Sequence, residues 1–192
     1  PWDMQPYQYG PKGGYKGGGP WHAYPAIPAS TAMLSVPLES GCVCYDPGCT
    51  AETGSDPAWQ AMDQALHLRY GHGFDLGTSN ASFCVANGEI ATASSSYTAL
   101  FKIPGKGHFT FSGSAMACGE DPRTHTPILF GNTALRSLGV DFSHHTGWFY
   151  SNVLGVGLYC TLTPTGHWSL PILDLLDLAG AVLQPSKNGH PP

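Results

Sequence analysis

Asp46 is the residue whose surroundings are best suited to carry chemistry. An apolar run, residues 43–45, leads directly into it, and Gly48 follows two positions later. A strand that delivers an acid into a tight turn can hold one carboxylate at a fixed position, where it can take part in general acid–base catalysis. Asp, Pro and Gly are also the ordinary residues of a turn, so a plain turn after a strand is the alternative interpretation.

The cysteines beside this acid raise the question of a metal site. Cys42, Cys44 and Cys49 could supply three zinc ligands, with His144 or His145 as the fourth. Structural zinc sites use cysteines in closely spaced pairs, and this chain has no second pair. Cys42 and Cys44 would share one face of a strand, so burial is the simpler explanation. We therefore expect no metal, and reduced, mostly buried thiols.

The composition bounds the class of protein. The chain has 192 residues, is 42% hydrophobic and only 11% charged, and carries a net charge of -5. This balance argues against nucleic-acid binding by the folded domain, and no apolar run reaches the roughly 18 residues that cross a membrane. No secretory signal pattern opens the chain. We expect an intracellular, cytoplasmic protein, and the first residue, Pro1, suggests a piece of a longer one.

The two ends of the chain differ from its middle. Residues 1–31 are rich in Gly, Pro and Tyr and nearly lack aliphatic side chains, so we expect a disordered linker there. Its tyrosines, together with Lys12 and Lys16, could stack on single-stranded RNA, but a linker is the preferred interpretation. Residues 32–178 are expected to form the folded domain, and residues 179–192 a flexible tail.

One helix stands out within this domain. Residues 56–68 open with Asp56, which can cap, and Pro57, which suits the first helical position. Trp59, Met62 and Leu66 recur at helical spacing, and glycines follow the helix.

The other expected elements are mostly strands. Asn87-Gly88 between two β-prone runs predicts a hairpin over residues 83–90. A short helix is expected around residues 135–138, where Gly139 ends it. The remaining β-prone runs are residues 33–38, 97–103, 108–111, 128–130, 140–142, 147–150, 158–162 and 168–173.

Four short motifs in a fixed order resemble a known family. They are Asp46-x-Gly48 after an apolar strand, residues 86–89 in the predicted hairpin, residues 127–131 followed by 135–142, and Gly166-His167-x-x-Leu170-Pro171. Together they resemble the retropepsin-like domains of copia-type retrotransposon polyproteins. In that group Cys-Thr and then Gly-Ser often follow the acid triplet, as Cys49-Thr50 and Gly54-Ser55 do here. The resemblance spans residues 34–175 in short pieces.

The resemblance implies a mainly β structure, a closed β barrel of the acid-protease type with a β-hairpin flap and one or two short helices. It also implies an aspartic endopeptidase that cuts peptide bonds of its polyprotein without metal or cofactor. One chain carries one acid triplet, so the active site would form across a homodimer, in which two carboxylates share a proton and activate a water. Carried over by motif, Asp46 is the acid; Pro47, Gly48, Cys49 and Thr50 are the active-site turn; Ala86, Asn87, Gly88 and Glu89 are the flap tip that contacts substrate; Ile128, Leu129 and Gly131 lie on the strand behind the acid.

Two departures from the family pattern leave alternatives open. Pro47 stands where the family has Thr or Ser, whose hydroxyl bonds across the dimer, and it also lacks an N–H. A degenerate, non-catalytic retropepsin-like module that binds peptides or itself is therefore the alternative function, and an unrelated small β-barrel binding domain is a third. Glu52-Thr53-Gly54 is a competing acid triplet, but it follows a polar loop of small residues. We expect Glu52 to be better solvated and less fixed than Asp46, which we prefer as the acid.

Overall fold

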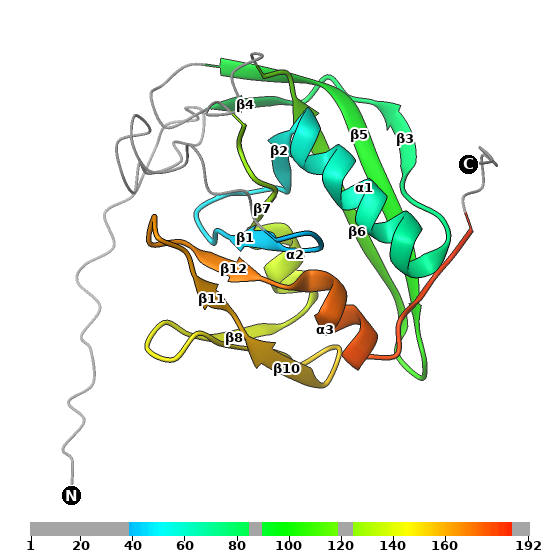
Figure 1. The fold of residues 1–192 in the computed structure, drawn as a ribbon, viewed down its shortest axis with the longest axis vertical. Coiled ribbons are helices and arrows are strands. Elements are labelled where there is room, and N and C mark those ends of the chain that lie inside the picture. Colours follow the sequence, from blue (N-terminus) through cyan, green and yellow to red (C-terminus); the bar gives the residue numbers. More distant parts are fainter. Residues whose placement is uncertain (1–38, 85–89, 119–124, 186–192) are drawn as a thin grey trace, which may run out of the picture.

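The computed structural model describes residues 39–84, 90–118 and 125–185, and within them the chain is mainly β, as the sequence predicts (Figure 1). Ten strands form one mixed sheet, with the order β11-β12-β1-β7-β2-β6-β5-β13, and β3 and β4 also pair with β5. Their bounds are β1 (Val43–Tyr45), β2 (Thr53–Ser55), β3 (Asp75–Thr78), β4 (Ser82–Cys84), β5 (Ile90–Ile103), β6 (Gly107–Met116), β7 (Leu129–Phe130), β11 (Thr161–Leu162), β12 (Trp168–Leu170) and β13 (Val182–Leu183).

The long ribbon of β5 and β6 is the largest piece of this sheet. The two strands pair from Ala93↔Met116 to Ile103↔Gly107, which extends both predicted strands. Alternate side chains of β6 point inward, so Phe109 and Phe111 are buried and Thr110 between them is exposed. This inward face forms one side of the hydrophobic core.

Helix α1 (Asp56–Tyr70) confirms the predicted helix and covers this ribbon (Figure 1). Trp59, Met62 and Leu66 are buried as expected, and the Trp59 indole N–H donates to the Ser114 carbonyl oxygen on β6 (3.2 Å). The N-cap position is taken by Ser55, one residue before the expected Asp56. At the other end Gly71 adopts φ 82, the left-handed conformation that glycine tolerates best.

The pairing of the two flanking strands confirms the predicted hairpin around Asn87-Gly88. Strand β4 pairs antiparallel with the start of β5, with Phe83 opposite Ala91. The proposed flap tip, residues 86–89, lies outside the described residues, as do the predicted strand at 33–38 and the linker at 1–31.

A second, smaller sheet follows β7 and α2 (Asn132–Ser137). It has the order β10-β9-β8, with β8 (Val140–Ser143), β9 (Trp148–Ser151) and β10 (Val156–Tyr159). The predicted hairpin over 140–142 and 147–150 is therefore confirmed, and Gly139 (φ 56) follows α2 as expected. This sheet packs Phe149 and Phe142 toward β1, where Phe142 lies 4.2 Å from the Tyr45 ring, centroid to centroid.

The C-terminal part departs from the sequence prediction. The expected extended run at 168–173 ends at Leu170, and α3 (Ile172–Leu178) begins after Pro171. Ile172, Leu173, Leu175 and Leu176 are all buried, a spacing that fits one side of a helix. The fold also continues past residue 178, because β13 pairs with β5 and buries Leu183, so the domain extends into the segment expected to be a tail.

The expected closed barrel is not what the strands form. The sheet path starts at β11 and finishes at β13, and within the described segments these two strands do not pair with each other. Closing a barrel requires the first and last strands to meet with a matching stagger. Here α1 and α3 cover the sheet and β8–β10 form a separate one, so the core is enclosed by layers (Figure 1).

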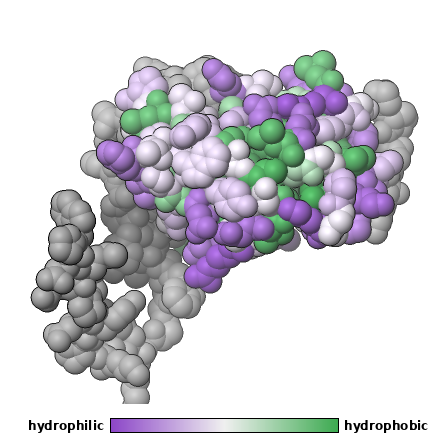
Figure 2. All heavy atoms as spheres, turned by 90° about the horizontal axis from the view of Figure 1, so that it is seen from below, coloured by the Kyte–Doolittle hydropathy of each residue, from purple (hydrophilic) through white to green (hydrophobic). Residues whose placement is uncertain are grey.

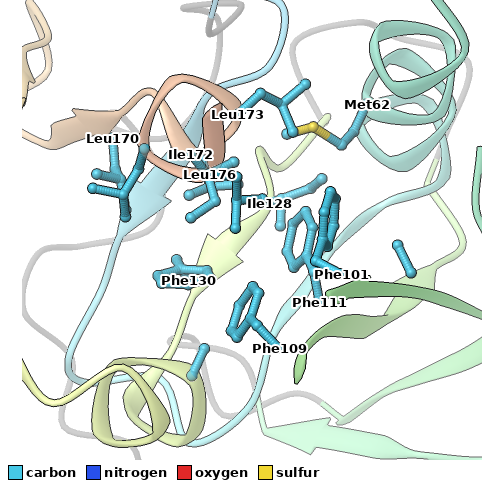
Figure 3. Close-up of a cluster of buried hydrophobic side chains, with 14 of the residues drawn as sticks. Met62, Phe101, Phe109, Phe111, Ile128, Phe130, Leu170, Ile172, Leu173 and Leu176 are labelled. Carbon is cyan, nitrogen blue, oxygen red and sulfur yellow. The ribbon is translucent and has the colours of Figure 1, made fainter. Parts of the chain in front are cut away.

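The core is shared by elements from both halves of the chain. In Figure 3, side chains of the β5–β6 ribbon, α1, β7 and α3 point toward one another. The labelled members are Met62, Phe101, Phe109, Phe111, Ile128, Phe130, Leu170, Ile172, Leu173 and Leu176. No half of the chain could enclose this cluster alone.

The surface carries hydrophobic residues because few charged ones are available. The face in Figure 2 shows a hydrophobic band among hydrophilic residues. Leu68 on α1 is 88% exposed, and Ile90 on β5 is 74% exposed. With 11% charged residues, single apolar side chains must occupy part of the surface.

We expect a chain ending at Leu178 to be less stable than the full chain by about 3 kcal/mol, because it loses the burial of Leu183 and the pairing of β13 with β5. Urea unfolding measures the difference. A chain ending at Pro185 is the matched control and should match the full chain; equal stability of both truncated chains would contradict the placement of β13.

Candidate active site

Asp46 stands at the end of a strand that is paired on both sides. Strand β1 runs antiparallel to β12, with Tyr45 opposite Trp168, and parallel to β7, with Tyr45 opposite Phe130. The Asp46 backbone N–H donates to the Phe130 carbonyl oxygen (3.2 Å). The backbone is therefore fixed up to the acid itself.

The turn after Asp46 is closed by the acid's own oxygens. Asp46 Oδ1 accepts the Gly48 N–H (3.0 Å), and its carbonyl oxygen accepts the Cys49 N–H (3.1 Å). Asp46 is half-buried, while Pro47 and Gly48 are exposed. Gly48 is not among the glycines with positive φ. Instead, a Cβ at Gly48 would lie 3.2 Å from Asp46 Oδ1, so this glycine leaves room for its N–H to approach the carboxylate.

The post-acid loop, residues 46–52, is held by the first turn of α2. The Asn132 N–H donates to the Cys49 carbonyl oxygen (2.7 Å), and Thr133 Oγ1 donates to the Thr50 carbonyl oxygen (2.6 Å). Gly131, the N-cap of α2, makes this approach possible: a Cβ there would lie 2.8 Å from the Cys49 carbonyl oxygen. Such a distance is too short for a side-chain carbon. Any residue other than glycine at position 131 would therefore displace the loop.

Of the three residues expected on the strand behind the acid, only Leu129 lies on β7: Ile128 precedes the strand, and Gly131 follows it as the N-cap of α2. Strand β7 lies beside β1, and the Ile128 carbonyl oxygen accepts the Cys44 N–H (2.8 Å). The same segment also holds strand β2 directly after the loop, because the Ser55 N–H and Oγ both bond to the Thr126 carbonyl oxygen (2.9 Å each). Residues 126–131 thus hold the strands on both sides of the post-acid loop.

The surroundings of Glu52 differ from those that the sequence predicts. This residue was expected to be solvated and loosely held, but its side chain is buried, with only 9% of the residue exposed. Its Oε1 accepts the Ala134 N–H in the first turn of α2 (2.9 Å), and burial raises the pKa of this carboxyl group. The polar loop before it does not solvate it, because that loop folds against α2. The competing acid is therefore the more buried of the two, and its hydrogen-bond partner lies on another element.

The cysteines around the acid have raised pKa values. Burial, and to a lesser degree the Asp46 carboxylate, raises the pKa of Cys44 to about 12, and burial raises that of Cys49 to about 11. Both therefore stay protonated at neutral pH. The described cysteines whose side chains are placed are free thiols: Cys42, Cys44, Cys49, Cys118 and Cys160. In the described segments no group of three or more His, Cys, Asp or Glu side chains is arranged to hold a metal.

The contacts that hold the loop were not visible in the sequence. Thr133 and the Ala134 N–H lie more than eighty positions from their partners Thr50 and Glu52. The sequence motif predicts Gly131 on a strand, whereas in the structure Gly131 matters because it has no side chain where two backbones approach closely. The structure brings Asp46, the turn and residues 128–131 together; the flap tip, residues 86–89, lies outside what it describes.

The comparisons with known proteins add no family assignment. No protein-family model matches the chain, and no curated protein and no solved structure matches it. The likeness to retropepsins therefore stands on the residues of this sequence. Among the described residues, none of the helices has the length and apolar character needed to cross a membrane.

We expect Gly131→Ala to lower the free energy of unfolding by about 2 kcal/mol, because the added carbon must push the post-acid loop off α2. Urea unfolding followed by tryptophan fluorescence measures this loss. Arg136→Ala changes an exposed side chain of the same helix and should stay within about 0.5 kcal/mol of the wild type. Equal stability of the two variants would show that the loop does not need this close approach.

Proposed function

We propose that this chain is an aspartic endopeptidase domain in which Asp46 pairs with Asp46 of a second copy. The observation that carries the proposal is the presentation of Asp46: a half-buried carboxylate at the end of the doubly paired strand β1, with the loop after it bonded to α2. A group held this rigidly can keep a reacting water in place, and a misplacement of about 1 Å can lower a rate roughly 10²-fold.

The chemistry follows from two carboxyl groups at close range. Two such groups cannot both be charged at low cost, so they share one proton. The charged carboxylate takes a proton from a water, which attacks the peptide carbonyl, and the neutral carboxyl donates a hydrogen bond to the carbonyl oxygen. No metal or organic cofactor takes part in this proposal, and the substrate is an extended peptide, such as a cleavage segment of the parent polyprotein.

The retropepsin-like fold belongs to the same proposal. It is supported by the parallel pair β1 and β7, the loop seated on α2, and the β4–β5 hairpin that would act as the flap. The open sheet and the separate β8–β10 sheet differ from the closed barrel that the resemblance implies. An intracellular, cytoplasmic location is part of this proposal and is supported by the free cysteines, which a reducing compartment favours.

Pro47 favours a second candidate function, a degenerate module that keeps the fold and binds peptides or itself without cutting them. Pro47 is exposed in the turn directly after Asp46. It offers neither a hydroxyl nor an N–H at the position from which the family's Thr or Ser bonds across the dimer. Paired acids in this module would be less rigidly aligned.

We expect Asp46→Asn to lower peptidase activity by at least about 10³-fold, because an amide cannot exchange the proton that activates the water. Cleavage of a peptide library taken from polyprotein segments measures the activity. Wild-type activity should be bell-shaped in pH with an acidic optimum, since one carboxyl must be charged and the other neutral.

Glu52→Gln is the matched control for that experiment, since it also converts one carboxyl into an amide. It should keep most of the activity, because the Gln oxygen can still accept the Ala134 N–H. Loss of activity in Glu52→Gln alone would mean that Glu52 is the catalytic acid. Specific activity should also rise with protein concentration as the dimer forms, and an active species that sediments as a monomer would contradict the pairing of two Asp46 residues.

The variant Pro47→Thr separates the two candidate functions. If Pro47 only weakens the dimer, restoring the hydroxyl should raise an existing activity by up to about tenfold, as one regained hydrogen bond allows. Activity that is absent in the wild type and present in Pro47→Thr would identify a degenerate module. Absence of activity in both, at concentrations where a dimer sediments, would contradict the peptidase proposal.

A further inference from the structure

Helix α2 has no side-chain cap of its own. Its N-cap is Gly131, which cannot bond to the free N–H groups of the first turn. Ser, Thr, Asp or Asn usually supplies this acceptor, and Gly131 excludes them because the post-acid loop fills the space beside it. The acceptor must therefore come from elsewhere in the chain.

Glu52 supplies it from the other end of the post-acid loop. Its Oε1 accepts the Ala134 N–H (2.9 Å), and its carbonyl oxygen accepts the Ser114 N–H of β6 (3.1 Å). Side chain and backbone of one residue thus tie the loop to α2 and to the β5–β6 ribbon. Glu52 is buried, so water cannot readily replace the Ala134 bond if the carboxyl is removed.

We propose that Glu52 is a positioning residue: by capping α2 from a distance, it holds the post-acid loop closed and thereby fixes Asp46. Its action on catalysis rests on the proposed peptidase function, but its hold on the loop does not. Glu52 would not touch the substrate, since its carboxyl is directed into the first turn of α2.

This arrangement makes the loop sensitive to pH in a definite direction. Burial raises the pKa of Glu52 above its ordinary value of 4.5, and the bond from Ala134 opposes the shift without cancelling it. The folded state therefore binds this proton more tightly than the unfolded state. Its contribution to stability is fully present below pH 4.5 and is lost as the pH rises through the folded pKa. The neutral acid keeps a carbonyl oxygen for the Ala134 N–H, so the loop is held best in acid.

The groups around Glu52 do not offset this effect. The titratable group that interacts with it is the Cys49 thiol of the same loop, whose own pKa burial raises to about 11, so it is uncharged. Helix α2 presents the Ala134 N–H, and β6 presents the Ser114 N–H, which do not titrate. The Glu52 charge therefore remains uncompensated by a cation among these contacts.

Thiol labelling of the full chain tests the hold on the loop without relying on peptidase activity. Cys49 lies half-buried in the loop, and its Sγ donates to the Ala51 carbonyl oxygen (2.9 Å), so N-ethylmaleimide should react with it faster when the loop opens. We expect Glu52→Ala to raise the labelling rate of Cys49 about tenfold and Glu52→Gln to stay within about twofold of the wild type. Peptide mapping assigns the label to each cysteine.

Cys160 is the internal control, because it is buried in the connection from β10 to β11 and its N–H bonds to the Gly147 carbonyl oxygen (2.8 Å), outside the post-acid loop. Its labelling rate should not change in any variant. Glu39→Gln removes an exposed carboxyl ahead of β1 and should leave the Cys49 rate unchanged. Equal increases at Cys49 and Cys160 would mean global unfolding and would overturn the proposal, as would an unchanged Cys49 rate in Glu52→Ala.

The pH dependence of Cys49 labelling distinguishes this role from one in which Glu52 only fills space, because a space-filling role would not change with pH. The ratio of the Cys49 labelling rates, wild type over Glu52→Gln, cancels the intrinsic reactivity of the thiol. We expect this ratio to increase as the pH rises from 5 to 8, since only the wild type acquires a buried charge. A constant ratio would overturn the pH-dependent role.

If the wild type proves to have no peptidase activity, the proposed function fails while these labelling results still decide the role of Glu52.

Discussion

The close packing of two backbones, the post-acid loop and the first turn of α2, is the constraint on which the candidate site depends. Gly131 lacks the Cβ that would collide with the Cys49 carbonyl oxygen. This space allows the Asn132 N–H and the Thr133 hydroxyl to reach the loop. Because the loop is bonded along its length, the position of Asp46 is determined by α2 and β7 as much as by its own strand.

Asp46 and Glu52, at the two ends of this loop, have different surroundings. Glu52 is buried with a raised pKa and bonds to α2, while Asp46 is half-buried and bonds to its own turn. A perturbed pKa is often taken to mark a catalytic group, but structural contacts perturb pKa values too. Here Glu52 accepts an N–H from the helix that it caps, whereas Asp46 accepts an N–H from its own turn and is only half-buried. The distinction between the two therefore comes from hydrogen-bond partners.

The strands that flank the acid come from distant parts of the chain. Strand β1 lies between β12 and β7, and the last strand, β13, pairs with β5 in the middle of the sequence. The core likewise joins α1 and β5–β6 to α3. Such non-local pairings must form together, because each loop closure costs entropy before the contacts offset it. The rigid presentation of Asp46 is thus a property of the whole fold, and residues 168–183 are as necessary to it as residues 43–52.

The sequence alone determined the elements whose signals are local. Pro57 and the spacing of Trp59, Met62 and Leu66 were enough for α1, and Asn87-Gly88 was enough to predict the β4–β5 hairpin. The mainly β class and the strand carrying Asp46 also followed from residue patterns. Tertiary structure decided what depends on distant partners. It buried Glu52 against α2, added β13 to the fold, turned Ile172 and Leu173 into a helix and left the sheet open. The physical reason is that local patterns specify which side of an element is apolar, whereas burial, hydrogen-bond partners and strand order depend on residues that meet only in the folded chain.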